Sequence, residues 1–153
     1  MVEVQGSQLA KKKKVLIIDD EAIILLGYKT LLTMNNYEVF TALSGEAAFS
    51  TLSRIDAPDL ILLDFQLGDM SGPEFLLQLG EKRPDIMQRV PVVFVTGMDE
   101  VPASKAVGFI RKPTDNDKLL ESVRRYIEAG TGPTPNSQLP TPKKSLFPNN
   151  GGL

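Results

Sequence analysis

The sequence predicts a three-layer α/β domain in which helices cover both faces of a five-stranded parallel sheet. Two observations lead to this fold class. Short apolar segments alternate five times with longer segments of helical periodicity. The short segments are almost continuously apolar, which is typical of strands that are buried on both faces.

The clearest predicted strand covers residues 60–64, which read Leu-Ile-Leu-Leu-Asp. Pro58 and Asp59 mark its start, and four large aliphatic residues in a row fit a strand buried on both faces. Four other apolar segments predict the remaining strands, over residues 15–18, 37–42, 91–95 and 107–110.

The segments between these strands carry apolar residues near helical spacing. They predict helices over residues 21–34, 44–55, 74–80 and 115–129. Ser44 is a candidate N-cap, and residues 65–73 contain so many turn formers that we expect a loop there. The alternation gives a flavodoxin-like (βα)5 architecture, for which the default strand order is 2-1-3-4-5.

The connection between the fourth and fifth strands is unusually short. Only residues 97–106 are available to cross from one parallel strand to the next, and Pro102 interrupts them. A parallel crossover needs about this length as a minimum. We therefore expect the fourth helix of the alternation to be short or missing.

Composition excludes several classes of function. The 153 residues carry a net charge of −2 and contain neither cysteine nor histidine. Disulfides, zinc fingers, thiol catalysis and imidazole bases are therefore excluded, and no overall basic field exists for nucleic acid or an anionic membrane. One domain is expected over residues 14–129, between a flexible arm at 1–13 and a disordered proline-rich tail at 130–153. No apolar run approaches the roughly 18 residues of a membrane span, so we expect a cytoplasmic protein.

Acidic residues stand at the ends of two predicted strands. Asp19 and Asp20 follow the first strand, and Asp64 ends the third. In an open parallel sheet, ligands bind at the edge formed by the carboxyl ends of the strands. If these two strands are neighbours, their carboxylates share a small volume, and like-charge repulsion requires a cation between them. The pattern therefore predicts a metal site.

The fourth and fifth predicted strands also end on polar residues, Thr96 and then Lys112-Pro113. Together with the acids, this ordered set resembles the receiver domains of two-component response regulators, over about residues 14–129. Each dipeptide is common alone, but the strand-end matches in this order are specific jointly. The resemblance implies a signalling phosphoprotein rather than an enzyme that turns over an external substrate.

The resemblance also implies a role for each site residue. Asp64 is the implied phosphoacceptor, which attacks phosphorus to form an aspartyl phosphate. The three aspartates and the backbone carbonyl of Gln66 would hold Mg²⁺, while Lys112 and Thr96 would bind the phosphoryl oxygens. Thr96 and Phe109 are implied switch residues, although a Phe in a buried strand is more often an ordinary core residue.

The implied phosphoryl donor is a histidine kinase or a histidine phosphotransfer protein. Residues 91–98 partly match the Pro-Phe-x-Phe-Ala-Thr-Gly-Tyr signature of a receiver subgroup with a reduced fourth helix, although Val92 replaces the first Phe and Met98 the Tyr. That subgroup is associated with HWE-type histidine kinases. A reduced fourth helix weakens the case for a dimer, so we expect a stand-alone monomer or weak dimer that signals to a protein partner or along a phosphorelay.

Two other interpretations stay open. A Mg²⁺-dependent phosphohydrolase also uses a strand-end aspartate as its nucleophile. Enzymes of the haloacid dehalogenase type place a second Asp two residues later, however, where this chain has Gln66. The other alternative is an interaction module of the same fold that works without phosphorylation. Such a module would have lost an acid, the threonine or the lysine, and none is lost here.

Overall fold

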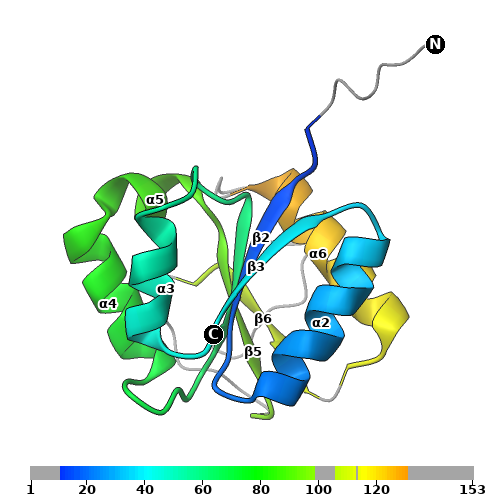
Figure 1. Cartoon of the computed structure of the whole chain (residues 1–153), viewed down its shortest axis with the longest axis horizontal. Helices are drawn as coiled ribbons and strands as arrows, with labels where there is room; N and C mark the ends of the chain where they lie inside the picture. Colours follow the sequence, from blue (N-terminus) through cyan, green and yellow to red (C-terminus); the bar gives the residue numbers. More distant parts are fainter. Residues whose placement is uncertain (1–10, 99–105, 113, 131–153) are drawn as a thin grey trace, which may run out of the picture.

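The computed structural model describes residues 11–98, 106–112 and 114–130 (Figure 1). Within these residues, five strands form one parallel sheet in the order β3-β2-β4-β5-β6, which confirms the predicted order 2-1-3-4-5. Most of the expected N-terminal arm and the expected tail lie outside the described residues. No described helix is both long enough and apolar enough to cross a membrane.

The central strand of the sheet is β4, which pairs with β2 on one side and β5 on the other. Ile18 lies beside Leu63 in the first pair, so the residues that follow β2 reach the same sheet edge as Asp64. The predicted strands are confirmed within one residue at each end. They are β2 (Lys14–Ile18), β3 (Glu38–Ala42), β4 (Leu60–Asp64), β5 (Val92–Thr96) and β6 (Gly108–Arg111).

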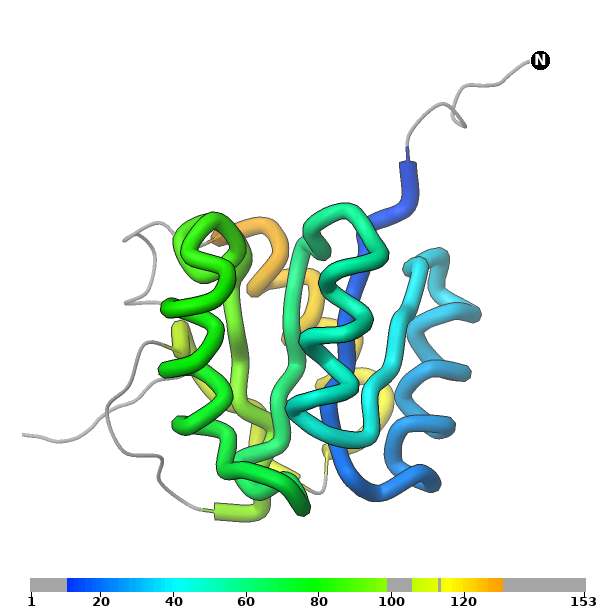
Figure 2. Tube along the Cα trace, turned by 60° about the vertical axis from the view of Figure 1, so that its left-hand side comes forward, coloured from blue at the N-terminus to red at the C-terminus, as the bar shows by residue number. Residues whose placement is uncertain are grey.

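Helices cover both faces of the sheet, as Figures 1 and 2 show. One face carries α3 (Gly45–Leu52), α4 (Gly72–Lys82) and α5 (Pro84–Arg89), and the other carries α2 (Ala22–Met34) and α6 (Asn116–Ala129). Each face has its own apolar core, because successive strand residues point to opposite sides. Phe75, Leu79 and Phe94 belong to the first core, and Leu32, Val123 and Tyr126 to the second.

Two helices differ from the sequence prediction. Helix α4 begins at Gly72 rather than at residue 74, because Ser71 and Glu74 form a capping box that starts the helix earlier. Helix α3 begins as predicted, with the Ser44 hydroxyl accepting a hydrogen bond from the Ala47 amide, but it ends at Leu52 rather than near residue 55.

Helix α5 was not predicted at all. Its six residues are too few to carry a readable helical period. Pro84 at the start and Asp85 in the first turn favour a helix N-terminus there. Ile86 is buried in the core beneath α4 and anchors this short helix.

The connection from β5 to β6 has no helix among its described residues. Residues 99–105 lie outside the described part of the chain. The whole connection spans residues 97–107, which leaves no room for a crossover helix as long as α2 with its flanking turns. Any helix in this connection can therefore only be short, which agrees with the expectation that the fourth helix of the alternation is short or missing.

Gly72 allows helix α4 to approach the end of β4 closely. A Cβ at this position would lie 2.6 Å from a ring carbon of Phe94 and 2.9 Å from the backbone oxygen of Asp64. No larger residue fits without moving the backbone. The loop that follows Asp64 is thereby held against the core.

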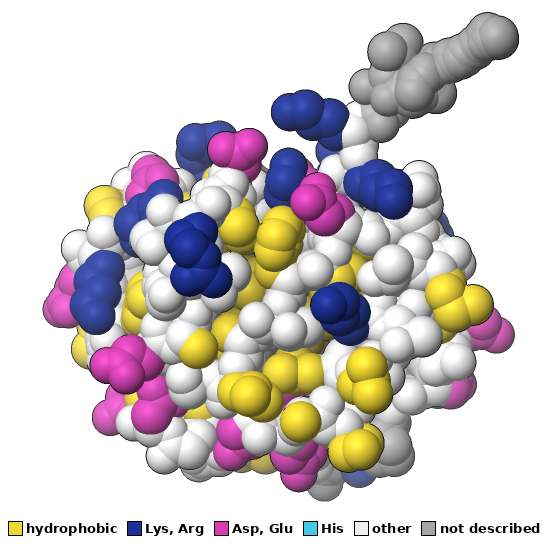
Figure 3. Space-filling view, viewed as in Figure 1, with side chains coloured by type: hydrophobic (Ala, Val, Ile, Leu, Met, Phe, Trp, Pro, Cys, Tyr) yellow, Lys and Arg dark blue, Asp and Glu magenta, His cyan; other side chains and the backbone are white. Residues whose placement is uncertain are grey.

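Charges are unevenly distributed over the face shown in Figure 3. Lysine and arginine side chains gather mainly in the upper half, toward the end where β2 begins. Acidic and apolar side chains dominate the lower end, where the strands finish. The carboxyl edge of the sheet is therefore the acidic end of this face.

Candidate functional site

Three aspartates meet at the carboxyl edge of the sheet, as the sequence predicted. Asp19, Asp20 and Asp64 each offer one carboxylate oxygen, and these oxygens lie within 4.8 Å of one another. The pairing of β2 with β4 brings them together. Asp19 is buried, Asp64 is partly buried and Asp20 is exposed, so the cluster opens to solvent on one side.

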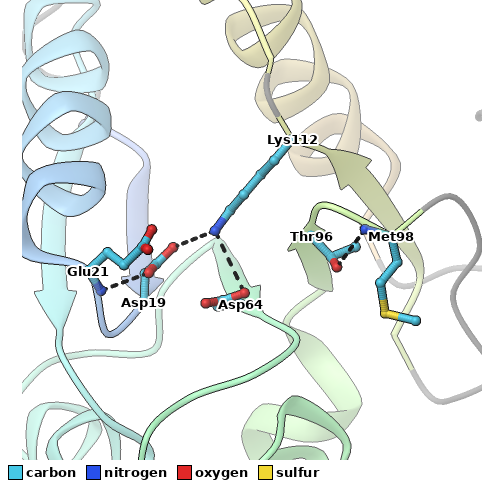
Figure 4. A network of polar contacts seen from close by, with 6 residues as sticks. All are labelled: Asp19, Glu21, Asp64, Thr96, Met98 and Lys112. Carbon is cyan, nitrogen blue, oxygen red and sulfur yellow. Dashed lines mark hydrogen bonds and ion pairs between the residues drawn. The ribbon is translucent and has the colours of Figure 1, made fainter.

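Asp19 is fixed through both of its carboxylate oxygens. Oδ1 accepts a hydrogen bond of 2.9 Å from the backbone N–H of Glu21, and Oδ2 accepts one of 3.0 Å from Nζ of Lys112 (Figure 4). The backbone N–H of Asp19 also donates to the Ala42 carbonyl at 3.1 Å. This aspartate is therefore the most rigidly held member of the cluster.

Lys112 places its ammonium group between two of the carboxylates. Nζ lies 3.0 Å from Asp19 and 3.7 Å from Asp64, and the side chain is only 20% exposed. The backbone is held as well, because the Lys112 N–H donates to the Thr96 carbonyl at 2.7 Å. Burial opposes the charged form, but the hydrogen bond to Asp19 and the negative charges of Asp19 and Asp64 raise the pKa of Lys112.

The pKa of Asp64 is also raised. Burial is the main cause, and the charge of Asp19 is the next. Lys112 and a backbone hydrogen bond with Gln66 act in the opposite direction without cancelling the effect. Three carboxylates against one ammonium group thus leave an excess of negative charge at this edge.

The cluster suits a small divalent cation. Mg²⁺ prefers oxygen ligands at about 2.0–2.1 Å, so opposite ligands lie roughly 4.2 Å apart around it. Carboxylate oxygens within 4.8 Å of one another need only a small closing movement to reach that arrangement. The loop after β4 borders the same space, because a Cβ on Gly68 would lie 3.8 Å from Oδ2 of Asp20. Gln66 is in this loop, two residues beyond Asp64.

Among the described residues, neither the Thr96 hydroxyl nor Phe109 forms a hydrogen bond with one of the three aspartates, and Thr96 is linked to the cluster only through its carbonyl, which accepts from the Lys112 N–H. Thr96 is buried at the end of β5, where its hydroxyl accepts a hydrogen bond of 3.1 Å from the backbone N–H of Met98 (Figure 4). Phe109 is partly buried and packs against the core beneath α3, α4 and α5. The switch roles of both residues stay predictions.

Tyr28 on α2 is a neighbour of the site that the sequence analysis missed. Burial raises the pKa of its phenol, the charge of Lys112 lowers it, and the charges of Asp19 and Asp64 raise it. Sequence spacing could have indicated this position. Tyr28 comes three residues after the buried Leu25, and that spacing places Tyr28 on the core face of the helix.

Comparisons with known proteins agree with this geometry. The family model for the response regulator receiver domain matches residues 15–124. The transcriptional regulatory protein CrdR of Helicobacter pylori is 28% identical over 122 residues, which cover 76% of this chain and 55% of CrdR. The chain thus spans about half the length of that relative.

Two further proteins are similar over nearly their whole length. Sporulation initiation phosphotransferase F of Bacillus subtilis is 28% identical over 121 residues, which cover 75% of this chain and 94% of the relative. The crystal structure of a CheY-like receiver domain protein from Methanospirillum hungatei superposes with a TM-score of 0.67 at 27% identity, covering 77% of this chain and 95% of that one. The match of the family model, together with the acid cluster at the strand ends, shows that the chain belongs to the response regulator receiver domain family.

Proposed function

We propose that this chain is a phosphoacceptor of two-component signalling, with Asp64 as the residue that receives the phosphoryl group. The observation that carries the proposal is the cluster itself: three carboxylate oxygens within 4.8 Å of one another, and the Lys112 ammonium 3.7 Å from Asp64. Asp64 is the partly buried acid at the centre of the sheet edge, between the fixed Asp19 and the next strand end at Thr96.

In the proposed transfer, a carboxylate oxygen of Asp64 attacks the phosphorus of a phosphohistidine. The new O–P bond forms as the P–N bond breaks, and the imidazole nitrogen keeps the electron pair and takes up a proton. Mg²⁺, held by Asp19, Asp20, Asp64 and the Gln66 carbonyl, would neutralise charge on the transferred group.

Lys112 and Thr96 would bind the phosphoryl oxygens after transfer. Lys112 supplies a compact ammonium group that already lies within reach of Asp64. The Thr96 hydroxyl, which accepts a hydrogen bond from the Met98 N–H in this structure, would donate its O–H to a phosphoryl oxygen. The resulting backbone movement, with Phe109 as a responding neighbour, is the proposed signal.

The proposed donor is a protein that carries a phosphohistidine, either a histidine kinase or a phosphotransfer protein. Ile23 and Leu26 of α2 follow directly after the acids and are 79% and 63% exposed, so they offer an apolar surface beside the site. The likeness to a sporulation phosphotransferase supports a place in a phosphorelay. The partial signature at residues 91–98 supports an HWE-type kinase as the donor.

The test is phosphorylation of the purified chain by a small-molecule phosphodonor with Mg²⁺, followed by intact-mass spectrometry. The wild type and an Asp85→Asn control, altered on the exposed surface, are expected to gain one phosphoryl group. Asp64→Asn is expected to gain none. Equal labelling of Asp64→Asn would refute the assignment, and turnover of a phosphate ester by the wild type would favour the phosphohydrolase alternative instead.

A further inference from the structure

The loop that follows Asp64 is closed on itself. Within residues 65–72, the Leu67 N–H donates to the Met70 carbonyl at 3.0 Å, and Gln66 forms an antiparallel bridge with Ser71. The Leu67 side chain is buried and anchors the loop to the core. We call this loop the acceptor loop, and its two halves are hydrogen-bonded to each other.

Asp69 ties the acceptor loop to a different element, helix α3. Its Oδ1 accepts a hydrogen bond of 3.0 Å from the Gly45 N–H, and its Oδ2 accepts one of 3.0 Å from the Glu46 N–H. Burial opposes ionisation, but the backbone hydrogen bonds outweigh it together and lower the pKa of Asp69. The carboxylate is therefore charged at neutral pH and sits at the positive end of the helix.

The first turn of α3 divides its free N–H groups between two acceptors. Ser44, the N-cap residue, accepts from Ala47 through its own hydroxyl at 3.0 Å. Asp69 accepts from Gly45 and Glu46, which are 24 and 23 residues away in sequence. The Ser44 contact is local to the helix, whereas the Asp69 contact joins the helix to the acceptor loop.

The residues beside Asp69 connect this contact to the acid cluster. Gly68, immediately before it, borders the Asp20 carboxylate. Met70, immediately after it, lies over Gly45, where a Cβ would clash with the Met70 side chain. Residues 68–70 thus reach from the acids to the N-terminus of α3. In the sequence they begin two residues after Gln66.

We propose that Asp69 is a positioning residue for the cation site. Its two hydrogen bonds to α3 hold the acceptor loop in place, so that the Gln66 carbonyl stays available beside Asp20 and Asp64 before a cation arrives. The inference rests on the proposed function, because it takes the Gln66 carbonyl as a ligand. Without Asp69, the cation must order the acceptor loop when it binds. The free energy of that ordering opposes cation binding and weakens the affinity.

The test is a Mg²⁺ titration of the full chain, followed by the amide NMR signals of Asp20, Gln66 and Gly68. Asp69→Ala is expected to weaken Mg²⁺ binding about tenfold, as is usual when a group that orients a metal ligand is removed. Asp69→Asn keeps an acceptor oxygen and is expected to recover part of the affinity. Ser44→Ala is the matched control, because it removes a cap from the same helix without touching the acceptor loop.

Ser44→Ala is expected to lower the melting temperature about as much as Asp69→Ala while leaving Mg²⁺ affinity unchanged. Equal losses of Mg²⁺ affinity in the two variants would overturn the proposal, because Asp69 would then act only through the stability of α3. Wild-type affinity in Asp69→Ala would overturn it as well, with the proposed function intact. A folded wild-type chain that binds no Mg²⁺ would overturn both.

Discussion

Replacing Asp64 by asparagine is expected to stabilise the metal-free protein. The carboxylate oxygens of Asp19 and Asp64 lie within 4.8 Å of each other. With an effective dielectric constant of about 20, two unit charges at that distance repel by about 3.5 kcal/mol. By the same estimate, the attraction between Asp64 and Lys112 at 3.7 Å is about 4.5 kcal/mol. The attraction to Lys112 exceeds the repulsion from Asp19, but repulsion from the exposed Asp20 offsets most of that excess. The cost of burying the Asp64 carboxylate therefore decides whether Asp64→Asn stabilises or destabilises the protein. We expect Asp64→Asn to gain on the order of 1 kcal/mol, which is the size of the difference between these opposing charge interactions.

The pH dependence follows from the raised pKa of Asp64. A carboxyl group whose folded pKa lies above its ordinary value of 3.8 contributes stability fully below pH 3.8. That contribution is lost as the pH rises through the folded pKa. The gain in unfolding free energy of Asp64→Asn over the wild type should therefore be absent in acid and reach its full size near neutral pH.

Magnesium is expected to reverse the order of stability. A ligand at ten times its dissociation constant stabilises a folded protein by about 1.4 kcal/mol. The wild type should gain this amount, whereas Asp64→Asn, which has lost one charged ligand, should gain less. The reversal would separate two effects of the Asp64 carboxylate: the electrostatic repulsion that it causes without Mg²⁺, and the stability that it adds as a ligand of Mg²⁺.

The assay is urea unfolding followed by circular dichroism, with chelator and then with Mg²⁺, at acidic and neutral pH. Asp85→Asn is the control, because Arg83 lowers the pKa of Asp85 and removing that carboxylate should not stabilise the protein. A metal-free Asp64→Asn variant less stable than the wild type at neutral pH would refute the electrostatic reasoning. A gain of the same size at every pH would refute it too.

Three other substitutions test separate parts of the structure. Gly72→Ala should cost about 3 kcal/mol in urea unfolding because its Cβ would overlap the core, whereas Gly27→Ala, with open space around it in α2, should gain about 0.5–1 kcal/mol. Lys112→Ala should cost about 2 kcal/mol without metal, because it leaves the buried Asp19 carboxylate without its ammonium partner, and Mg²⁺ should restore part of the loss. Burial raises the pKa of Tyr126 to about 12, so the wild type should lose stability above pH 10.0 in alkaline titrations, and Tyr126→Phe should lose less.

Strand positions and the meeting of the acids could be predicted because both depend on short-range sequence patterns. The continuous apolar run before Asp64 has no competing interpretation, and the parallel pairing of β2 with β4 then fixes where Asp19 and Asp20 lie. The Ser44 cap was readable for the same reason, since an N-cap depends on residues three apart.

Contacts between distant elements could not be predicted in the same way. The hydrogen bonds from Gly45 and Glu46 to Asp69 join segments more than 20 residues apart, and no local pattern marks them. The early start of α4 was readable in principle, because Ser71 and Glu74 have capping-box spacing, but the turn formers around them favoured a loop.

The position of the Lys112 ammonium group would make the proposed cation binding an exchange of one positive charge for another at the Asp19 and Asp64 carboxylates. In this structure the ammonium group already neutralises part of the charge on Asp19 and Asp64. A metal ion that took over those oxygens would set the ammonium group free to bind an anion. Because coupling between two ligands is reciprocal, an anion held by Lys112 must tighten metal binding by the same factor as the metal tightens anion binding.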